Sequence, residues 1–212
     1  MNFAILVIGA YLLGSVPFGL LIAKAHGKDL RVIGSGNIGA TNLARAVGRK
    51  WAYVCFCLDA AKGLLPMLAA GLMRSAEPTV AELAFTLIAG CAAILGHIFP
   101  VYIGFKGGKG VATSFGVALG LWPYFTLCSL ISFAVWLVVV LLSRYISLAS
   151  IIAAVTFPVV LVLGVWLTPS WRFGNLWPLL VGAVAIPVIV VIRHRHNIKR
   201  LISGTESKVL QK

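Results

Sequence analysis

The chain has 212 residues, of which 60% are hydrophobic and only 11% charged, and its mean hydropathy is +1.02. Soluble domains are about 45–50% apolar and about 25% charged, so this composition excludes an ordinary soluble protein and predicts an integral membrane protein. The formal net charge of +13 could suggest a nucleic-acid partner, but in a membrane protein it is typical of basic cytoplasmic loops and of anionic lipid or substrate. We expect one all-α membrane domain over residues 1–212 and no nucleic-acid partner.

Seven apolar stretches are candidate transmembrane helices, each of which needs about 20 residues to cross a bilayer. They cover residues 3–24, 53–73, 79–103, 111–122, 124–142, 148–168 and 175–192. The first has no basic region before it and no small-residue cleavage site near its end, so we interpret it as a retained helix. The expected fold is a polytopic bundle of seven transmembrane helices.

The uncharged run over residues 111–142 is the ambiguous part of this topology. As one helix it would be about 48 Å long, which is too long for a simple span. Gly120 and Pro123 offer a break. With the break and an outside N-terminus, fifteen of the 18 Lys and Arg residues fall on the inside. The positive-inside rule therefore favours seven spans with a cytoplasmic C-terminus.

Two charged residues interrupt the second apolar stretch. Asp59 and Lys62 are three residues apart, so they share one face of a helix and can form an ion pair. Charged residues inside a membrane are rare and are usually paired or functional. The spacing is compatible with a structural pair and with direct contact to a substrate.

The first polar stretch on the predicted inner side is GSGNIGATN at residues 34–42, which Arg45 follows. Its small hydroxyl and amide side chains offer many hydrogen bonds and little bulk. If Thr41 or Asn42 caps a short helix, Arg45 lies one turn later and could face the same anion. The alternative is a flexible polar loop with an ordinary inside arginine. The candidate phosphate-binding residues are Ser35, Gly36, Asn37, Thr41, Asn42 and Arg45.

The second polar stretch carries FKGGKG at residues 105–110. Glycine lets backbone N–H groups approach a ligand closely, and lysine supplies a mobile positive charge. Together they predict a cradle for a phosphate or carboxylate beside the lipid, although a general basic interface is the alternative. His97 precedes this stretch and either exchanges a proton with a substrate or is a satisfied structural group. The candidate binding residues are His97, Lys106, Gly107, Gly108, Lys109 and Gly110.

Two further polar stretches are predicted on the inner side, RYISLAS at residues 144–150 and RHRHNIKRL at residues 193–201. Ser147 is placed like the N-cap of the sixth apolar helix, and the N-terminus of that helix would also attract an anion. The second stretch contains His194 and Asn197. Taken alone, it is equally compatible with a basic tail on anionic lipid.

The polar residues also restrict the chemistry. Asp29 and Glu206 are the only carboxylates in the inner segments, which leaves a Ser–His–acid triad without its third member. The His and Cys spacing does not suggest a zinc site, and Mg²⁺ would need clustered carboxylates. An enzyme of this kind needs an already activated substrate, with binding and charge stabilisation supplying most of the catalysis. We expect no metal and no cofactor.

The motifs GSGNIGATN, GHIFPVYIGFKGGKGVAT (96–113), RYISLAS and RHRHNIKRL resemble, in this order, those of the bacterial acyl-phosphate:glycerol-3-phosphate acyltransferases, over essentially the whole chain. The resemblance implies transfer of a fatty acyl group from acyl phosphate to the 1-hydroxyl of sn-glycerol 3-phosphate. The products would be lysophosphatidic acid and phosphate, in phospholipid synthesis. It also implies a seven-helix enzyme of the bacterial inner membrane with its site facing the cytoplasm. We expect a monomer whose partners are these two substrates and the bilayer.

The resemblance also implies a role for each matching position. Ser35 and Arg45 would bind phosphate, and Asn37, Thr41 and Asn42 would shape their loop. Lys109, with the backbone of Gly107, Gly108 and Gly110, would form a second part of the pocket. His194 and Asn197 fit a His-x-x-Asn pattern, with His194 ranked above His196 by spacing, and Glu206 fits a trailing structural glutamate. The expected catalytic residues are Lys109, Ser147, His194 and Asn197.

The expected mechanism is direct attack by the glycerol hydroxyl, without a covalent intermediate, while Lys109 and Arg45 neutralise negative charge. The proton acceptor is either a phosphate oxygen of a substrate or a histidine, His194 or His97. An anion transporter is the competing class, but it predicts an internal repeat and a pocket near the midplane, and we find no convincing repeat. A CDP-alcohol type phosphotransferase would need a D-x-x-D-G cluster, which is missing.

Overall fold

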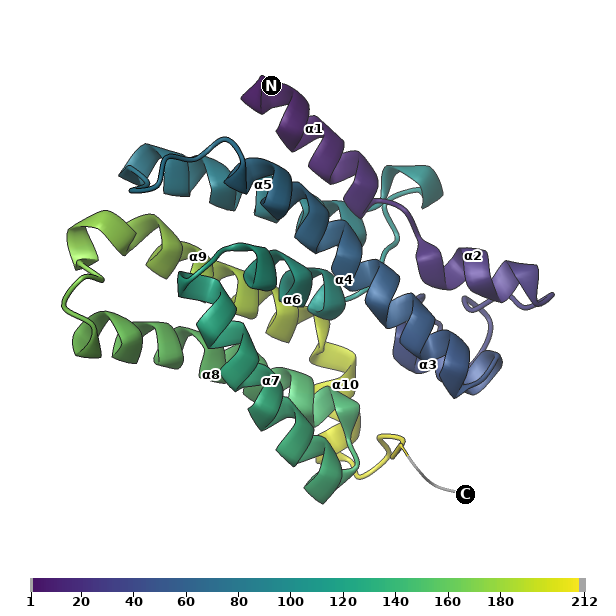
Figure 1. Ribbon diagram of the computed structural model, residues 1–212. Helices are drawn as coiled ribbons and strands as arrows, with labels where there is room; N and C mark the ends of the chain where they lie inside the picture. Colours follow the sequence, from purple (N-terminus) through teal and green to yellow (C-terminus); the bar gives the residue numbers. More distant parts are fainter. Residues whose placement is uncertain (1, 210–212) are drawn as a thin grey trace. The chain divides into compact units, whose positions relative to one another are not determined.

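The computed structural model describes residues 2–209, and all regular structure within them is helical (Figure 1). The elements in chain order are α1 (Phe3–Gly14), α2 (Phe18–Ala25), α3 (Ala40–Ala46), α4 (Arg49–Gly71), α5 (Val80–Ile98), the 3₁₀ helix η1 (Val101–Ile103), α6 (Val111–Gly120), α7 (Tyr124–Ser143), α8 (Ile146–Leu167), α9 (Phe173–Arg193) and α10 (Arg195–Ile202). The all-α class expected from the sequence is confirmed.

Six segments within the described residues are long and apolar enough to cross a membrane. They are Phe3–Ala25, Arg49–Gly71, Val80–Ile103, Tyr124–Ser143, Ile146–Leu167 and Phe173–Arg193. The fourth predicted span, residues 111–122, corresponds to α6, which has only 10 residues. At 1.5 Å per residue it is about 15 Å long, half of a typical hydrocarbon core. The structure therefore supports a multi-pass bundle with six candidate spans and one short apolar helix.

The first predicted span is not one continuous helix. α1 ends at Gly14 and α2 begins at Phe18, with Pro17 immediately before it. Proline has no N–H to donate and disfavours helical geometry at the preceding residue, which explains the interruption at Val16. The span predicted over residues 3–24 is matched by the candidate segment Phe3–Ala25, which consists of two helices for this reason.

By contrast, the predicted break in the run 111–142 is confirmed. α6 ends at Gly120, and α7 begins at Tyr124, directly after Pro123. Pro123 is well placed there, because the first turn of a helix needs no N–H donor at its start. The glycine and the proline thus act as the sequence suggested.

The described residues form two compact units. The first unit contains α1 to α4, the second half of α5, and α6. Here α4 and α6 lie side by side (Figure 1). A Cβ on Gly63 would collide with the carbonyl of Thr113, and one on Gly116 with the carbonyl of Ala60. The two glycines let the backbones of α4 and α6 approach closely, as small residues do between membrane helices.

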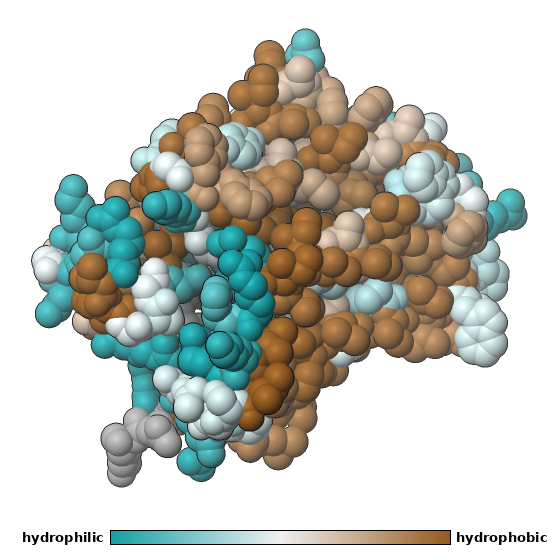
Figure 2. All heavy atoms as spheres, turned by 180° about the vertical axis from the view of Figure 1, so that it is seen from behind, coloured by the Kyte–Doolittle hydropathy of each residue, from teal (hydrophilic) through white to brown (hydrophobic). Residues whose placement is uncertain are grey.

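The second unit contains the first half of α5 and the helices α7 to α10. α7 and α8 form an antiparallel pair joined at Arg144, which adopts a left-handed conformation with φ of 63°. α9 packs on α8, and α10 follows directly after His194. Large apolar side chains such as Leu142 and Trp166 are exposed, as expected of surface that contacts lipid. Figure 2 shows one face of the molecule, with broad hydrophobic areas beside a smaller hydrophilic area.

Candidate active site

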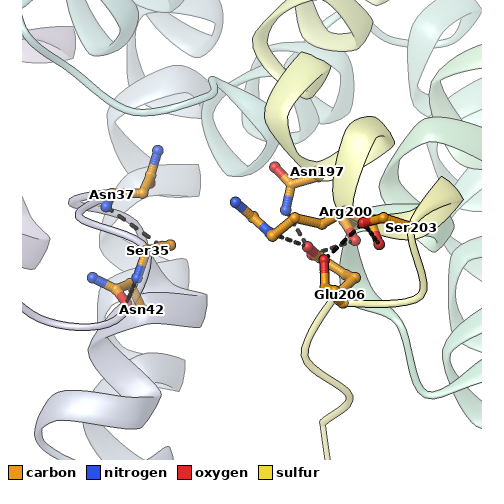
Figure 3. A network of polar contacts seen from close by, with 9 residues as sticks. Ser35, Asn37, Asn42, Asn197, Arg200, Ser203 and Glu206 are labelled. Atoms are coloured by element: carbon orange, nitrogen blue, oxygen red, sulfur yellow. Dashed lines mark hydrogen bonds and ion pairs between the residues drawn. The ribbon is translucent and has the colours of Figure 1, made fainter.

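The first polar loop is held by one buried amide, Asn42. Its Oδ1 accepts the N–H of Ser35 at 3.0 Å, and its Nδ2 donates to the carbonyls of Leu30 and Ile33 at 3.1 and 2.9 Å (Figure 3). Gly34 has a φ of 57°, and a Cβ there would lie 2.5 Å from Asn42 Oδ1. Asn42 therefore shapes the loop, because its amide is already engaged with the backbone, and glycine is required beside it.

The helix after this loop begins earlier than the sequence suggested. Gly39 is the N-cap of α3, so Thr41 and Asn42 lie in its first turn and do not cap it. The carboxamide of Asn37 instead accepts the N–H of Gly39 at 2.9 Å. The predicted capping role of Thr41 or Asn42 was wrong, because the local side chain–backbone bond of Asn37 fixes the chain before the helix starts.

Ser35 in this loop and Arg45 in the following helix α3 are accessible. Both are exposed, and Ser35 Oγ accepts a long hydrogen bond of 3.4 Å from the N–H of Asn37. Arg45 has no ion-pair partner within residues 2–209 and its Cδ lies near Gly34. The hydroxyl of Ser35, in a loop fixed by Asn42, and the guanidinium of Arg45, on the helix that follows, suit a dianionic phosphate.

Replacing Asn42 with alanine is expected to lower the free energy of unfolding by about 1–3 kcal/mol, because buried polar groups lose their partners. Thermal unfolding in detergent measures the effect. Asn175→Ala is the control, since Asn175 is exposed at the start of α9. Equal melting temperatures for the two variants would show that the amide does not hold the loop.

The glycines of the FKGGKG stretch pack against α5. The N–H of Gly107 donates to the carbonyl of Ile98 and that of Gly108 to the carbonyl of His97, both at 3.1 Å. A Cβ on Gly107 would collide with the carbonyl of His97, and one on Gly108 with Nε2 of its imidazole. The predicted cradle of backbone N–H groups is therefore corrected at these two positions, because their amides close the end of α5.

The two lysines of this stretch differ in their surroundings. Lys106 is exposed, whereas Lys109 is partly buried and lies between Gly108 and Gly110, both buried. Gly110 has a φ of 85°, which a residue with a side chain rarely adopts. The chain is thus turned at Gly110 directly into α6, and Lys109 is the more constrained of the two cations.

The expected pair within α4 is present. Lys62 Nζ lies 2.8 Å from Asp59 Oδ1, and both side chains are at most 5% exposed. His97 Nδ1 lies 3.6 Å from the same Asp59 oxygen, within ion-pair range but beyond hydrogen-bond length. His97 itself is 6% exposed. The sequence predicted the pair and missed that His97 joins it.

In the second unit, Glu206 brings three residues together (Figure 3). Its Oε1 accepts the hydroxyl of Ser147 at 2.7 Å and the amide of Asn197 at 2.6 Å, and its Oε2 accepts Nε of Arg200 at 2.6 Å. Ser147 and Asn197, both predicted site residues, therefore lie together. The family resemblance implied a structural role for Glu206 but not these partners, although its position as the one carboxylate in a basic tail was a signal.

Ser147 is not the cap of α8. Tyr145 holds that position, and Ser147 is the second residue of the helix. Its hydroxyl is drawn to Glu206, which is 59 residues later in the chain. The N-cap prediction was wrong because a tertiary partner, which local spacing does not reveal, determines where the side chain points.

His194 marks the junction between α9 and α10 and is only 2% exposed. Its Nδ1 lies 2.8 Å from the carbonyl of Val190. A carbonyl can only accept, so Nδ1 carries a proton. The neutral form of His194 therefore has its lone pair on Nε2, which fixes the atom that any proton transfer would use.

Burial of the Glu206 carboxylate opposes its ionisation, but hydrogen bonds from Ser147, Asn197 and Arg200 outweigh burial and lower its pKa. A carboxylate with a lowered pKa stabilises the fold above its unfolded pKa, and this contribution disappears as the pH falls through the folded value. The stabilisation by Glu206 is therefore present at neutral pH and is lost in acid.

The stability advantage of the wild type over Glu206→Gln is expected to be constant near neutrality and to shrink as the pH falls below about 4.3, the ordinary pKa of glutamate. Melting temperatures across pH measure this difference. The control is Glu77→Gln, at an exposed glutamate, whose difference from wild type should be small throughout. An advantage that grows in acid would contradict the assignment.

The predicted residues thus fall into two groups. Ser35, Gly36, Asn37, Thr41, Asn42, Arg45, His97 and the residues 106–110 belong to the first unit, and Ser147, His194 and Asn197 to the second. Within residues 2–209 no three His, Cys, Asp or Glu side chains gather as a metal site. The chemistry offered by the two groups is that of cations, hydroxyls and amides, which bind and stabilise anions.

Comparison with known proteins gives one consistent result. The family model "Glycerol-3-phosphate acyltransferase" matches residues 4–204. The glycerol-3-phosphate acyltransferase of Trichlorobacter lovleyi is 48% identical over 202 residues, 95% of each chain, and that of Geobacter sulfurreducens is 46% identical over 209 residues, 98% of each chain.

A solved structure agrees. The crystal structure of PlsY (YgiH), an integral membrane glycerol 3-phosphate acyltransferase, in its glycerol 3-phosphate form is 42% identical and has a TM-score of 0.85, covering 97% of this chain and 94% of that one. Its lysophosphatidic acid form has a TM-score of 0.82 at 41% identity, with the same coverage.

Proposed function

The chain belongs to the glycerol-3-phosphate acyltransferase family, and from this premise we propose that it transfers a fatty acyl group from acyl phosphate to the 1-hydroxyl of sn-glycerol 3-phosphate. The products are 1-acylglycerol 3-phosphate (lysophosphatidic acid) and inorganic phosphate. The observation that carries the acceptor and the product is the similarity to PlsY, whose structures are its glycerol 3-phosphate and lysophosphatidic acid forms.

The resemblance to the acyl-phosphate-dependent family implies the donor, and the type of residues in the predicted site supports it. An acyl phosphate is a mixed anhydride and brings its own leaving group, so the enzyme need only bind, orient and neutralise charge. The exposed guanidinium of Arg45 and the constrained ammonium of Lys109 are suited to phosphate oxygens. This chemistry supports acyl phosphate as the donor.

In the proposed reaction the hydroxyl oxygen of glycerol 3-phosphate attacks the carbonyl carbon of the acyl phosphate. The new ester bond forms, the bond from the carbonyl carbon to the phosphate oxygen breaks, and the hydroxyl proton leaves. Ser35, in the loop that Asn42 fixes, and Arg45, in α3, hold phosphate. Lys109 neutralises the charge that develops during transfer, and no covalent enzyme intermediate is formed.

In the second unit, Ser147, His194 and Asn197 are proposed to complete substrate binding and catalysis. Glu206 orients the hydroxyl of Ser147 and the amide of Asn197 through its Oε1. Because Ser147 donates its proton to Glu206, its oxygen lone pairs face other donors. Ser147 is thereby oriented as an acceptor, and Glu206 fixes the side-chain amide of Asn197.

Two acceptors for the hydroxyl proton are considered. A phosphate oxygen of a bound substrate can take it, or Nε2 of His194 can act as the base, since Nδ1 of His194 already donates to Val190. Turnover of His194→Gln against pH distinguishes them. Loss of the pH-dependent limb with unchanged substrate binding supports the histidine, whereas an unchanged profile at lower rate supports the substrate phosphate.

We further propose that the chain spans the bacterial inner membrane seven times as a monomer, with its N-terminus outside and its site on the cytoplasmic face. The short α6 then supplies only part of the fourth crossing, packed against α4. Single cysteines at Ser75 and Ser207, in a chain whose four native cysteines are replaced, are expected to be labelled from opposite sides. If both cysteines are labelled from the same side, the chain has an even number of spans and the seven-span proposal is wrong.

Purified protein in lipid vesicles, supplied with palmitoyl phosphate and labelled glycerol 3-phosphate, tests the proposed activity. We expect labelled lysophosphatidic acid, and much less of it when palmitoyl-CoA replaces palmitoyl phosphate. Acylation from the CoA ester alone would contradict the donor. Accumulation of labelled glycerol 3-phosphate inside intact vesicles, without acylation, would instead support the anion transporter.

A further inference from the structure

A buried cluster of ionisable side chains lies in the first unit, and one of its members, His97, is also a candidate binding residue. It consists of Asp59, Lys62 and His97, and each of the three side chains is at most 6% exposed. Charged groups within a membrane segment are expensive to bury and usually have a function. A buried ion pair is in addition a poor source of stability, because apolar residues of similar size often serve as well.

One arm of the cluster reaches the segment that supports the first polar loop. Lys62 Nζ donates to the carbonyl of Val16 at 2.8 Å, at the interruption between α1 and α2, and lies 5.6 Å from the ring centre of Phe18. One residue further, a Cβ on Gly19 would collide with the carbonyl of Ile38 in the polar loop. Lys62 thus fixes the start of α2, on which the loop rests.

The other arm reaches the second polar loop through His97. The imidazole has Asp59 at Nδ1 and the backbone of Gly108 at Nε2, where a Cβ would collide. The carbonyl of His97 also accepts the N–H of Gly108 at 3.1 Å. The residue after Gly108 is Lys109, so a shift of the imidazole would displace the backbone that carries this lysine.

We infer that Asp59, Lys62 and His97 are positioning residues, which hold the two glycine-rich loops of the first unit at a fixed separation for acyl transfer. The inference rests on the proposed function. Asp59 joins the two arms, because its carboxylate faces both the ammonium of Lys62 and the imidazole of His97. His97 acts on the loop through its packing against the backbone of Gly108, and we assign it no proton transfer.

The paired variant Asp59→Leu/Lys62→Met separates positioning from mere stability. It removes both charges and keeps apolar volume, so no buried charge is left unpaired. We expect a melting temperature within a few degrees of wild type, but a kcat/KM lowered by about 100-fold, since small misplacements of binding groups have effects of that size. A folded variant with wild-type kcat/KM would overturn the inference.

A second set of variants keeps the test decisive if the paired variant does not fold. Gly108→Ala should lower kcat/KM because its methyl group collides with the His97 ring. Removing the ring in His97→Ala/Gly108→Ala should make the added methyl group nearly harmless relative to His97→Ala alone. Gly174→Ala, at an exposed glycine with open space around it, is the control. If the loss of kcat/KM in the double variant equals the product of the losses in the two single variants, the inference is overturned.

A pH profile gives an independent readout. His97→Gln should lower kcat/KM and leave the shape of its pH dependence unchanged, since His97 is assigned no proton transfer. If His97→Gln loses one limb of the dependence of kcat/KM on pH, His97 acts as a base and its positioning role is overturned. All variants are compared with wild-type protein on palmitoyl phosphate and glycerol 3-phosphate. An inactive wild type contradicts the proposed function, whereas an active wild type with unaffected variants contradicts only this inference.

Discussion

Replacing Glu206 with alanine is expected to lower kcat/KM for acyl transfer by about 100-fold or more, because precise placement of binding groups contributes that much. The carboxylate is the shared acceptor of Ser147, Asn197 and Arg200. Without it the hydroxyl of Ser147, 5% exposed, and the amide of Asn197 lose the partner that orients them. The rate of lysophosphatidic acid formation by purified protein measures the effect.

Two comparisons make this result specific. Glu77→Ala removes an exposed glutamate in the second unit and should leave turnover near the wild-type value. Glu206→Gln keeps the shape of the side chain and one acceptor oxygen, so it should retain more activity than Glu206→Ala. If Glu206→Ala turns over like the wild type, the network does not position Ser147 and Asn197 for the reaction.

Replacing Lys109 with alanine is expected to lower kcat by about 10²–10³-fold, the usual effect of removing one group that stabilises charge in a transition state. Lys109 is partly buried between two buried glycines, and the chain turns sharply at Gly110, φ 85°. The side chain of Lys109 therefore has less conformational freedom than that of an exposed lysine. Pre-steady-state measurement of product formation separates this effect from slow product release.

Lys106→Ala is the matched control for Lys109, since the two lysines belong to one loop and only Lys106 is exposed. The prediction for Lys106→Ala is a several-fold rise in KM at most, because an exposed charge is screened by salt and solvent. Lys109→Arg should remain impaired, since a guanidinium does not replace a compact ammonium at a constrained position. Equal effects of Lys106→Ala and Lys109→Ala would mean that the loop provides only general positive charge.

The helical pattern of this chain could largely be read from its sequence. Long uncharged runs predict helices, and Gly120 with Pro123 correctly marked the break between α6 and α7. Pro17, which lies inside an apolar run, marks the interruption between α1 and α2 in the same way. The ion pair of Asp59 and Lys62 was predictable because helical spacing alone brings the two side chains together.

The details of the site were less accessible, because they depend on tertiary partners. The spacing of Gly107 and Gly108 suggested N–H donors for an anion, but these amides bind the carbonyls at the end of α5. Ser147 resembled a helix cap until Glu206, far away in sequence, was seen to accept its hydroxyl. His97 and Asp59 belong to two different helices, so no local sequence pattern predicts that they lie close together.

Phosphate exchange tests our proposal that the acyl group passes directly from acyl phosphate to glycerol 3-phosphate. Reconstituted protein is incubated with palmitoyl phosphate and labelled inorganic phosphate, first without and then with glycerol 3-phosphate. Direct attack predicts no label in palmitoyl phosphate when the acceptor is absent, and lysophosphatidic acid with one phosphate released per acyl group when it is present. Labelled palmitoyl phosphate formed without the acceptor would reveal an acyl-enzyme and contradict the account.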